Sequence, residues 1–443
     1  MKLFLHEPKV VARGPVCEEA AWGYFQFPRV HKLPDGRLAV WIHDEDDQPH
    51  TLGLGAKLWY VSEDEGETWQ KGDSSLAGLC GTEVSPGVRM LPIAKPVIDL
   101  SAKGMGIPPF RLAAYNVPSD RVEQPEKSAD PHKMPEGIGV FYDAFTSQDR
   151  YYYADTLPEG LTEKTLRFLR YDERTGETSI CDRPVEWPYL PVKTYRQPDA
   201  PVRMLQPGLY ESDNLKRGPG GTLWVSTYRT ASDPENGALS TYDAAYLLRS
   251  DDGGDSWKLA AWQPYIPDTK ADKLAWWRDG FSETDIEFMP DGSMIMLLRS
   301  TCVFHGGPEW GPLYFSRSAD GGKTWTKPQV FDKIGILPQL RRLECGVTLA
   351  VYGRPGIFVR ASEDPSGLRW EAPVEVMTPN DRSGLMNRPP VRPNFHQWAG
   401  SCCNVHATIL GPNKIIIAYS DFYVPDEKGI KRKTILTQVI EVR

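Results

Sequence analysis

The side chains in this sequence that could do chemistry are carboxylates, histidines and arginines. Two carboxyl groups that flank a bond can act on it together, one as a general acid and the other as a general base or nucleophile. A histidine can act as a general acid or base because its ordinary pKa lies near neutrality. Arginines bind anionic groups through charge-assisted hydrogen bonds. Which of these side chains converge depends on the elements that position them.

The composition predicts short strands joined by turns. The chain has 443 residues, of which 40% are hydrophobic, with 39 glycines and 39 prolines. Glycine and proline mark turns, so numbers this high favour a protein built from many hairpins. The length alone suggests two or three domains, but an internal repeat overrides that expectation.

The charge and the cysteines limit partners and compartment. The net charge of −8 disfavours nucleic acid or an anionic membrane surface as a partner. We find no apolar run of about 18 residues and no signal-peptide pattern at the N-terminus, so we expect no membrane span and a cytoplasmic location. Seven cysteines without a CxxC spacing predict free thiols in a reducing compartment.

One turn pattern recurs four times along the chain. The segments 62–69, 250–257 and 318–325 share the sequence Ser-x-Asp-x-Gly-x-Ser/Thr-Trp, and 362–370 is a looser copy with one extra residue. In such a turn the Asp side chain can accept backbone N–H bonds, and Gly supplies a positive φ. We call these four segments the Asp-Gly-Trp turns, and we expect each Trp to pack into its own sheet.

A second pattern alternates with the first. Hairpin turns lead into apolar strands at 33–40, 219–225 and 289–295, with weaker copies at 344–349 and 411–417. Hairpin, strand, Asp-Gly-Trp turn and strand together make one four-stranded blade. The sequence therefore predicts an all-β single domain, 1–443: a six-bladed β-propeller of four-stranded antiparallel blades.

The predicted blades follow from the positions of the turns. Blade one covers about 20–72, and blades three to six cover about 205–260, 280–330, 335–375 and 400–443. Blade two must lie within about 77–203 together with a large insertion. The last strands are expected to pair with an N-terminal strand at about 9–11.

With these turns in this order, the chain resembles the sialidase-like superfamily, also called BNR-repeat or Asp-box proteins. The resemblance covers nearly the whole chain and rests on the Asp-Gly-Trp turns of blades one, three, four and five. Such turns specify the fold well and the function poorly. They lie at the periphery of the blades, so we expect no catalytic role for them.

The resemblance implies a site with three arginines, an acid/base Asp, and a Tyr nucleophile paired with a Glu. Glu283 matches the glutamate before the fourth-blade turn, and Arg299 matches the arginine at the end of the following strand. Arg354 is a candidate for the third arginine. The resemblance therefore makes Glu283 a catalytic candidate and the two arginines candidates for binding an anionic group.

Other positions depart from the pattern of the superfamily. Gln26 stands where the first arginine is expected, and alternation along the strand would direct the neighbouring Arg29 elsewhere. His50 or Thr51 stands where the acid/base Asp is expected. Glutamine supplies neither the charge nor the forked geometry of a guanidinium.

The last predicted blade departs as well. Asn404 replaces the nucleophilic tyrosine and His406 replaces the aspartate that follows it, while Tyr419 lies on the next strand. Loss of the nucleophile removes the retaining sialidase mechanism itself. These departures argue against ordinary sialidase activity and for a redirected site.

Glu283 and Glu211 are therefore the predicted acid/base partners, and Glu211 opens the innermost strand of blade three. The alternative for each is a structural carboxylate. His50 and His406 are the predicted assisting groups, although a lone histidine is more often structural. The predicted substrate-binding residues are Arg299, Arg354, Gln26, Asn404 and Tyr419. Aromatic residues that could stack on sugar rings or pack between blades are Trp22, Tyr24, Trp310 and Trp398.

The sequence thus predicts an exo-acting glycoside hydrolase for an acidic or plant or microbial oligosaccharide. A uronate lyase that uses His and Tyr, and a non-catalytic glycan-binding propeller, remain the alternatives. Neither a metal nor another cofactor is expected, because no HxH or HExxH spacing joins His50, His305, His396 and His406. The oligomeric state is left open by the sequence.

Overall fold

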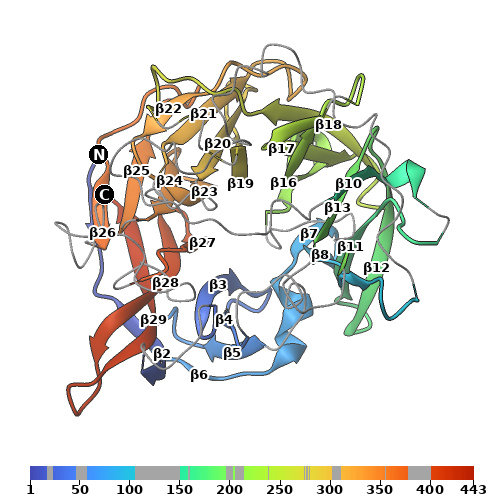
Figure 1. Ribbon diagram of the computed structural model, residues 1–443. Helices are drawn as coiled ribbons and strands as arrows, with labels where there is room; N and C mark the ends of the chain where they lie inside the picture. Colours follow the sequence, from blue (N-terminus) through green and yellow to red (C-terminus); the bar gives the residue numbers. More distant parts are fainter. Residues whose placement is uncertain are drawn as a thin grey trace, which may run out of the picture. The chain divides into compact units, whose positions relative to one another are not determined.

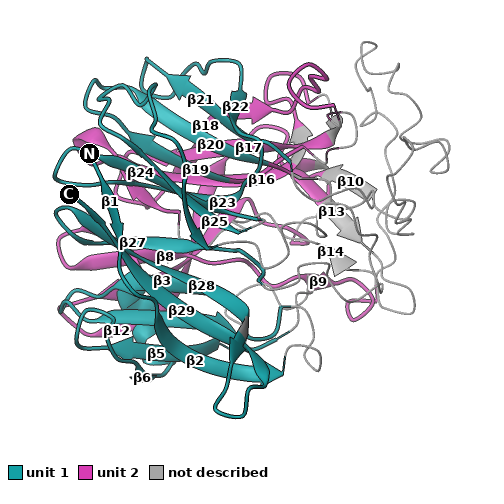
Figure 2. Cartoon of the chain, turned by 90° about the vertical axis from the view of Figure 1, so that its left-hand side faces the viewer, with its two compact units in different colours: residues 1–80, 284–299, 310–443 teal, residues 81–283, 300–309 magenta. Residues whose placement is uncertain are grey.

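The structure is a computed structural model that describes residues 1–16, 23–45, 57–104, 150–157, 160–195, 203–204, 214–237, 239–273, 275, 278, 280–301, 311–354, 356–377 and 401–443. These residues fall into two compact units. Unit 1 consists of 1–80, 284–299 and 310–443, and unit 2 consists of 81–283 and 300–309 (Figure 2). Both units are nearly all-β. Within the described ranges, no helix is long and apolar enough to cross a membrane.

Two four-stranded antiparallel sheets of unit 1 are built to the same plan. The first has the order β3-β4-β5-β6, with β3 (Gln26–Lys32), β4 (Leu38–His43), β5 (Lys57–Ser62) and β6 (Gln70–Lys71). The second has the order β23-β24-β25-β26, with β23 (Ile336–Arg342), β24 (Thr348–Gly353), β25 (Ile357–Ser362) and β26 (Val374–Met377). In each sheet the strands follow one another in sequence, as predicted for a blade.

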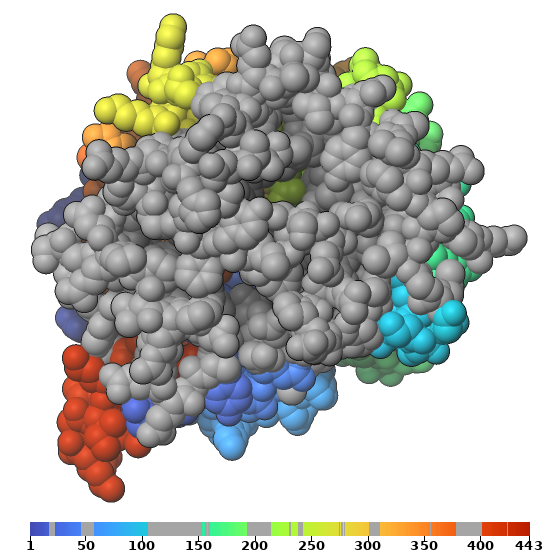
Figure 3. All heavy atoms as spheres, in the orientation of Figure 1, coloured from blue at the N-terminus to red at the C-terminus, as the bar shows by residue number. Residues whose placement is uncertain are grey.

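A third sheet of unit 1 joins the two ends of the chain (Figure 1). Its main order is β1-β29-β28-β27, with β1 (Leu3–Leu5), β27 (His406–Gly411), β28 (Lys414–Pro425) and β29 (Lys431–Val442). Strand β2 (Lys9–Val16) also pairs with β29, so the expected pairing of the N-terminal strand is present. The hairpin between β28 and β29 projects from this sheet (Figures 1 and 3).

Strand β19 (Gly280–Phe288) begins in unit 2 and ends in unit 1. Three further strands follow it in the sheet in the order β20 (Met294–Thr301), β21 (Leu313–Ser318) and β22 (Gln329–Asp332). This group corresponds to the predicted fourth blade.

Unit 2 contains two more sequential groups of strands. One has the order β7 (Thr82–Ser85), β8 (Val88–Pro92), β11 (Thr165–Asp172) and β12 (Glu177–Glu186). The other has the order β15 (Lys216–Arg217), β16 (Leu223–Ser232), β17 (Leu239–Ser250) and β18 (Trp257–Pro264). They meet where β12 and β18 pair in parallel.

An extra four-stranded sheet belongs to the predicted insertion. Its order is β10-β13-β14-β9, with β10 (Arg150–Tyr153), β13 (Pro191–Tyr195), β14 (Arg203–Met204) and β9 (Ile98–Asp99). The remaining regular elements in the described ranges are three short 3-10 helices, η3 (Ser74–Cys80), η8 (Ala154–Thr156) and η9 (Pro219–Gly221). The insertion thus carries a sheet of its own.

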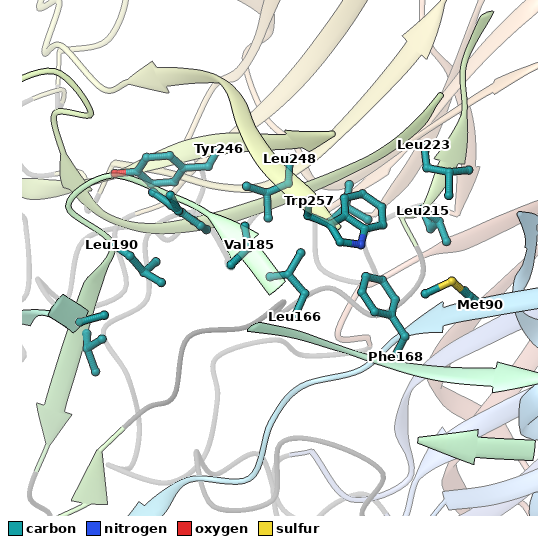
Figure 4. Packing of buried hydrophobic residues seen from close by; sticks show 14 of the residues in the cluster. Met90, Leu166, Phe168, Val185, Leu190, Leu215, Leu223, Tyr246, Leu248 and Trp257 are labelled. Atoms are coloured by element: carbon teal, nitrogen blue, oxygen red, sulfur yellow. The ribbon is translucent and has the colours of Figure 1, made fainter. Parts of the chain in front are cut away.

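Alternating apolar residues build the cores between sheets. In unit 2, Phe168 of β11 stacks on Trp257 of β18 with ring centroids 5.3 Å apart, and Leu248 packs beside them (Figure 4). In unit 1, Val40 of β4 packs in one cluster with Ile416 of β28. Burial of such side chains contributes about 1.5–3 kcal/mol each before chain entropy is subtracted.

The Asp-Gly-Trp turns have the predicted hydrogen bonds. In the first turn, Ser62 Oγ donates to Asp64 Oδ1 at 2.8 Å, and Thr68 N–H donates to the same oxygen at 2.9 Å. The Trp69 indole N–H donates to the Gly66 carbonyl at 3.1 Å, and Gly66 has a φ of 94°. Hydrogen bonds from Thr68 and Ser62 lower the pKa of Asp64 to about 2.

The turns at 250–257 and 318–325 repeat these bonds atom for atom. In the looser copy, Arg369 N–H and Ser366 N–H donate to the Asp364 carboxylate instead. The structure thus confirms the turn chemistry. The closure into six blades and the single domain remain predictions.

Candidate functional site

The first sheet of unit 1 has a β-bulge where β3 begins. Gln26 pairs with His43 and Arg29 pairs with Trp41, so β3 holds one residue more than β4 between these two pairs. Phe27 takes a φ of 53° there, and the following Pro28 has no N–H to donate to a ladder. Gln26 is fully buried, and its Oε1 accepts the N–H of Gly23. The bulge therefore fixes the orientation of the residues around Gln26.

The bulge corrects the prediction that Arg29 points away from Gln26. An extra residue reverses the alternation, so Gln26 and Arg29 stand opposite His43 and Trp41, which lie on one face of β4. The Arg29 guanidinium carbon lies 6.0 Å from the Trp41 ring centroid. A guanidinium is thus present on this face, three residues after the expected position.

His43 and Lys57 are additional polar residues of this face that the sequence analysis missed. Lys57 pairs with His43 across the hairpin, and its Nζ lies 4.9 Å from the Trp41 ring centroid. Burial, together with the charges of Lys57 and Arg29, lowers the pKa of His43 to about 2, so its imidazole is neutral. The Phe-Pro pair opposite the end of β4 is the signal that could have pointed to this group.

Strand β23 of the second sheet begins with the same irregularity. Ile336 pairs with Gly353 and Gln339 with Val351, and Leu337 has a φ of 42° directly before Pro338. The pair Leu337-Pro338 therefore repeats the pair Phe27-Pro28. The bulge lies beside the end of β24, where Arg354 follows Gly353.

Arg354 and Asn404 are in direct contact. Arg354 Nη2 donates to Asn404 Oδ1 at 3.0 Å and to the Cys402 carbonyl at 2.8 Å, and Nε reaches the same carbonyl at 3.1 Å. Both side chains are buried. Arg354 and Cys403 have φ values of 54° and 52°. Two of the predicted substrate-binding residues thus form one rigid group.

The backbone around this group is tightly packed. A Cβ atom on Gly353 would lie 1.7 Å from the Cys403 carbonyl oxygen. That distance is far below any contact that a side chain tolerates, so only glycine fits there. This close approach holds the end of β24 against the segment that carries Asn404.

His406 accepts a backbone hydrogen bond. Its Nδ1 accepts the N–H of Val30 at 3.1 Å, so that nitrogen carries no proton. The ring is buried, and its centroid lies 5.2 Å from that of His31. His406 therefore joins β27 to β3, and its catalytic role stays a prediction.

Asp285 accepts a backbone N–H from β23, as His406 accepts one from β3. Its Oδ2 accepts the Leu340 N–H at 2.7 Å and an Arg341 N–H at 3.1 Å. Arg341 also donates through Nε to the Ala407 carbonyl of β27 at 2.8 Å. Val30 and Leu340 thus occupy equivalent places, each three residues after the residue with positive φ in its bulge. Each donates its backbone N–H to a side chain from another strand.

The Tyr419 side chain is buried in the core of unit 1. Its hydroxyl donates to Gln438 Oε1 at 3.1 Å, and its ring packs in the cluster that contains Val405 and Leu436. Burial raises the pKa of the Tyr419 hydroxyl above its ordinary value. No recorded contact joins it to Arg354 or Asn404 within the described residues, and its substrate-binding role stays a prediction.

The remaining candidates are placed as follows. Glu283 is buried on β19 with a φ of 22° and belongs to unit 2. Arg299 is buried on β20, where it pairs with Leu313, and belongs to unit 1. Tyr24 packs against the core of unit 1. The candidates outside the described residues are Glu211, His50, Thr51, Trp22, Trp310, Trp398, His305 and His396.

In the part of the chain that the structure describes, no group of three or more His, Cys, Asp or Glu residues could hold a metal ion. The groups that converge at Arg354 are its guanidinium, the Asn404 amide and the Cys402 backbone carbonyl. Their chemistry suits hydrogen bonding to a polar organic molecule.

The sequence matches no protein-family model and no curated protein. Among solved structures, a protein of unknown function from Dyadobacter fermentans has a TM-score of 0.55 and 15% identity, and the match covers 100% of this chain and 99% of that chain. An alpha-L-arabinanase of Penicillium chrysogenum complexed with arabinobiose has a TM-score of 0.45 and 11% identity, covering 98% of both chains.

A sialidase of Trypanosoma rangeli in complex with sialic acid has a TM-score of 0.41 and 10% identity, covering 99% of this chain and 58% of that chain. At such identities a likeness concerns the fold alone. The match to the Dyadobacter protein shows a shared fold over the full length of both chains, and it leaves the function to be argued from the site.

Proposed function

We propose that this protein is a carbohydrate-active enzyme, an exo-acting glycoside hydrolase for an acidic or plant or microbial oligosaccharide. One observation carries the proposal: strained backbone gathers at the positions where the resemblance to sialidases expects functional groups. Five of the eight non-glycine residues with positive φ in the described ranges lie at or directly beside these positions, namely Phe25, Phe27, Glu283, Arg354 and Cys403. Phe25 and Phe27 lie where β3 begins, Glu283 lies within β19, Arg354 directly follows β24, and Cys403 lies just before β27.

Strain of this kind supports a functional interpretation. A residue in a sparsely populated backbone region costs about 1–3 kcal/mol and persists where the surroundings enforce it, commonly in active sites. Here the enforcing contacts are the Gly353–Cys403 approach and the hydrogen bonds of Arg354. The backbone of the candidate site is therefore held in place before any ligand binds.

The proposed roles follow from the chemistry of each side chain. Glu283 would serve as one catalytic carboxyl group and Glu211 as the other. Arg354 and Asn404 would orient a polar or acidic sugar, and Gln26 would supply an amide to it. Because Gln26 and Asn404 replace an arginine and a tyrosine, we propose an activity different from that of an ordinary sialidase.

Incubation with a panel of neutral and uronate-containing oligosaccharides tests this proposal. A hydrolase releases sugars without a new double bond, whereas a lyase product absorbs in the ultraviolet. Saturable binding without any cleavage would identify a glycan-binding protein instead. Release of sialic acid from an aryl sialoside at an ordinary rate would contradict the redirected site.

A further inference from the structure

Unit 2 contains a cavity that lies outside the candidate site described above. It has a volume of about 480 Å³ and lies beside the connection from β8 to β9 and the loop before β11. Three of its lining residues are cationic, Lys95, Lys103 and Arg167, and two are acidic, Asp99 and Glu163. A volume between roughly 300 and 1,000 Å³ is typical of pockets for small molecules.

Lys95 is buried in the wall of this cavity with neutral partners. Lys95 as a whole is only 7% exposed to solvent. Its Nζ donates to the Thr165 hydroxyl and, at 3.4 Å, to the Glu163 carbonyl oxygen. No carboxylate in the described ranges forms an ion pair with it. A buried ammonium group that is not ion-paired with a carboxylate costs free energy, which an anion in the cavity would recover.

Arg167 is a second cationic residue of the cavity wall, and part of its guanidinium group has no recorded contact within the described residues. Its Nε and Nη2 donate to the two oxygens of Asp182 at 2.9 and 2.7 Å, which fixes the plane of the guanidinium group. No contact is recorded for Nη1 in the described part of the chain. A guanidinium fixed in this way offers the remaining N–H groups to an oxyanion at little cost in side-chain entropy.

The two acidic lining residues do not cancel these charges. Asp99 accepts the Ala102 N–H at 2.9 Å and so serves the local turn. The Glu163 side chain is exposed to solvent, and its contact with Lys95 is made by the backbone carbonyl. Burial lowers the pKa of Lys95, and the charges of Asp182 and Glu163 oppose this shift without forming an ion pair with its ammonium group.

We infer that this cavity binds a small molecule through one oxyanion group, which Lys95 and Arg167 contact together. The oxyanion is a carboxylate or a phosphate, and the room around it suits a monosaccharide-sized body. The inference does not depend on the proposed hydrolase activity, because none of the lining residues belongs to the candidate site.

Calorimetric titration of the full chain tests the inference, with glucuronate and glucose 6-phosphate as probes at constant ionic strength. We expect one equivalent of at least one probe to bind saturably. Lys95→Met should weaken this binding at least about tenfold, because it removes a charge-assisted hydrogen bond. Lys164→Met is the matched control, since Lys164 pairs with Asp155 outside the cavity lining, and it should bind as the wild type does.

A second measurement on the unmodified protein avoids any dependence on the folding of a variant. Reductive methylation followed by mass spectrometry should show that the bound probe slows modification of Lys95 and leaves Lys164 unaffected. The two probes distinguish a carboxylate from a phosphate. The inference fails if neither probe binds, if neutral glucose binds equally well, or if Lys95 is not protected.

Discussion

Arg354 and Asn404 bind each other in the buried part of unit 1, and this contact should affect activity as well as stability. Asn404→Leu keeps the size of the side chain but removes the oxygen that Arg354 Nη2 contacts at 3.0 Å. We expect a loss of at least about tenfold in kcat/KM on an oligosaccharide substrate, because Arg354 is no longer held in its proposed binding orientation. The lost hydrogen bond to a charged group should also lower the unfolding free energy by about 1.5–3 kcal/mol.

Asn413→Ala is the control for this prediction. Asn413 donates to the Val442 carbonyl at 3.0 Å in the same sheet but outside the candidate site, so its loss should lower stability alone. Equal effects of the two variants on kcat/KM and on the unfolding free energy would contradict a role for Asn404 in substrate binding.

His43 should make the protein sensitive to mild acid. Its pKa is about 2 in the folded chain, against 6.5 for an unperturbed side chain. Between these values the unfolded chain binds a proton that the folded chain does not, so stability falls as the pH drops below about 6.5, by up to about 1.4 kcal/mol per pH unit. Above that pH the group contributes no slope.

Denaturant unfolding of wild type and His43→Gln between pH 8 and pH 5 checks this expectation. The variant should show a shallower loss of stability on acidification, and the two curves should run parallel above pH 7. Parallel curves over the whole range would show that His43 titrates normally in the folded protein.

At the level of single residues, the sequence located some contacts and misjudged others. Arg354 and Asn404 were both selected, and the structure brings them together. The direction of Arg29 was wrong, because alternation holds only in a strand without a bulge, and the bulge arises from the paired positive φ and proline at Phe27-Pro28.

The Asp-Gly-Trp turns are the elements that should contribute most to local stability. Asp252 accepts bonds from Ser250 Oγ at 2.7 Å, Ser256 N–H at 3.0 Å and Ser256 Oγ at 2.5 Å. Asp252→Ala should reduce the free energy of unfolding by about 1–2 kcal/mol without changing kcat. Asp255→Ala in the same turn, where the side chain is 74% exposed, should have little effect in the same denaturant titration. A change in kcat for Asp252→Ala would place the turn closer to the chemistry than we propose.

The end of β24 should tolerate only glycine at its last position. Gly353→Ala would force a Cβ against the Cys403 carbonyl, so the strand end must move and displace Arg354. We expect a loss of both stability and activity. Gly411→Ala is the control, because its Cβ would meet only the flexible Lys414 side chain at 3.1 Å. Thermal unfolding and substrate turnover of the two variants check this, and a fully active Gly353→Ala would refute the tight packing.

The elements could be predicted from the sequence where their signals are local. The turns and most sequential strands fall where the repeat put them, since each depends on residues within one hairpin. The sheet β10-β13-β14-β9 was missed because it pairs segments as distant as Asp99 and Arg203, for which no local pattern exists. The same limit applies to His406, whose partner Val30 lies at the other end of the chain.

For the whole molecule, the sequence established a nearly all-β protein and a narrow set of candidate residues. It could not fix the chemistry, because that depends on the distance between carboxyl groups rather than on their spacing along the chain. The structure adds the concentration of positive φ values at the candidate positions, which no sequence pattern displayed.

Turnover of an oligosaccharide substrate by wild type and by Glu283→Gln tests the central proposal most directly. Glu186→Gln, an exposed glutamate at the end of β12 in the same unit, serves as the control. Loss of a catalytic carboxyl should lower kcat by about 10²- to 10⁴-fold, with the fold and the thermal stability retained and the control unaffected. Full turnover by Glu283→Gln would contradict the proposed site.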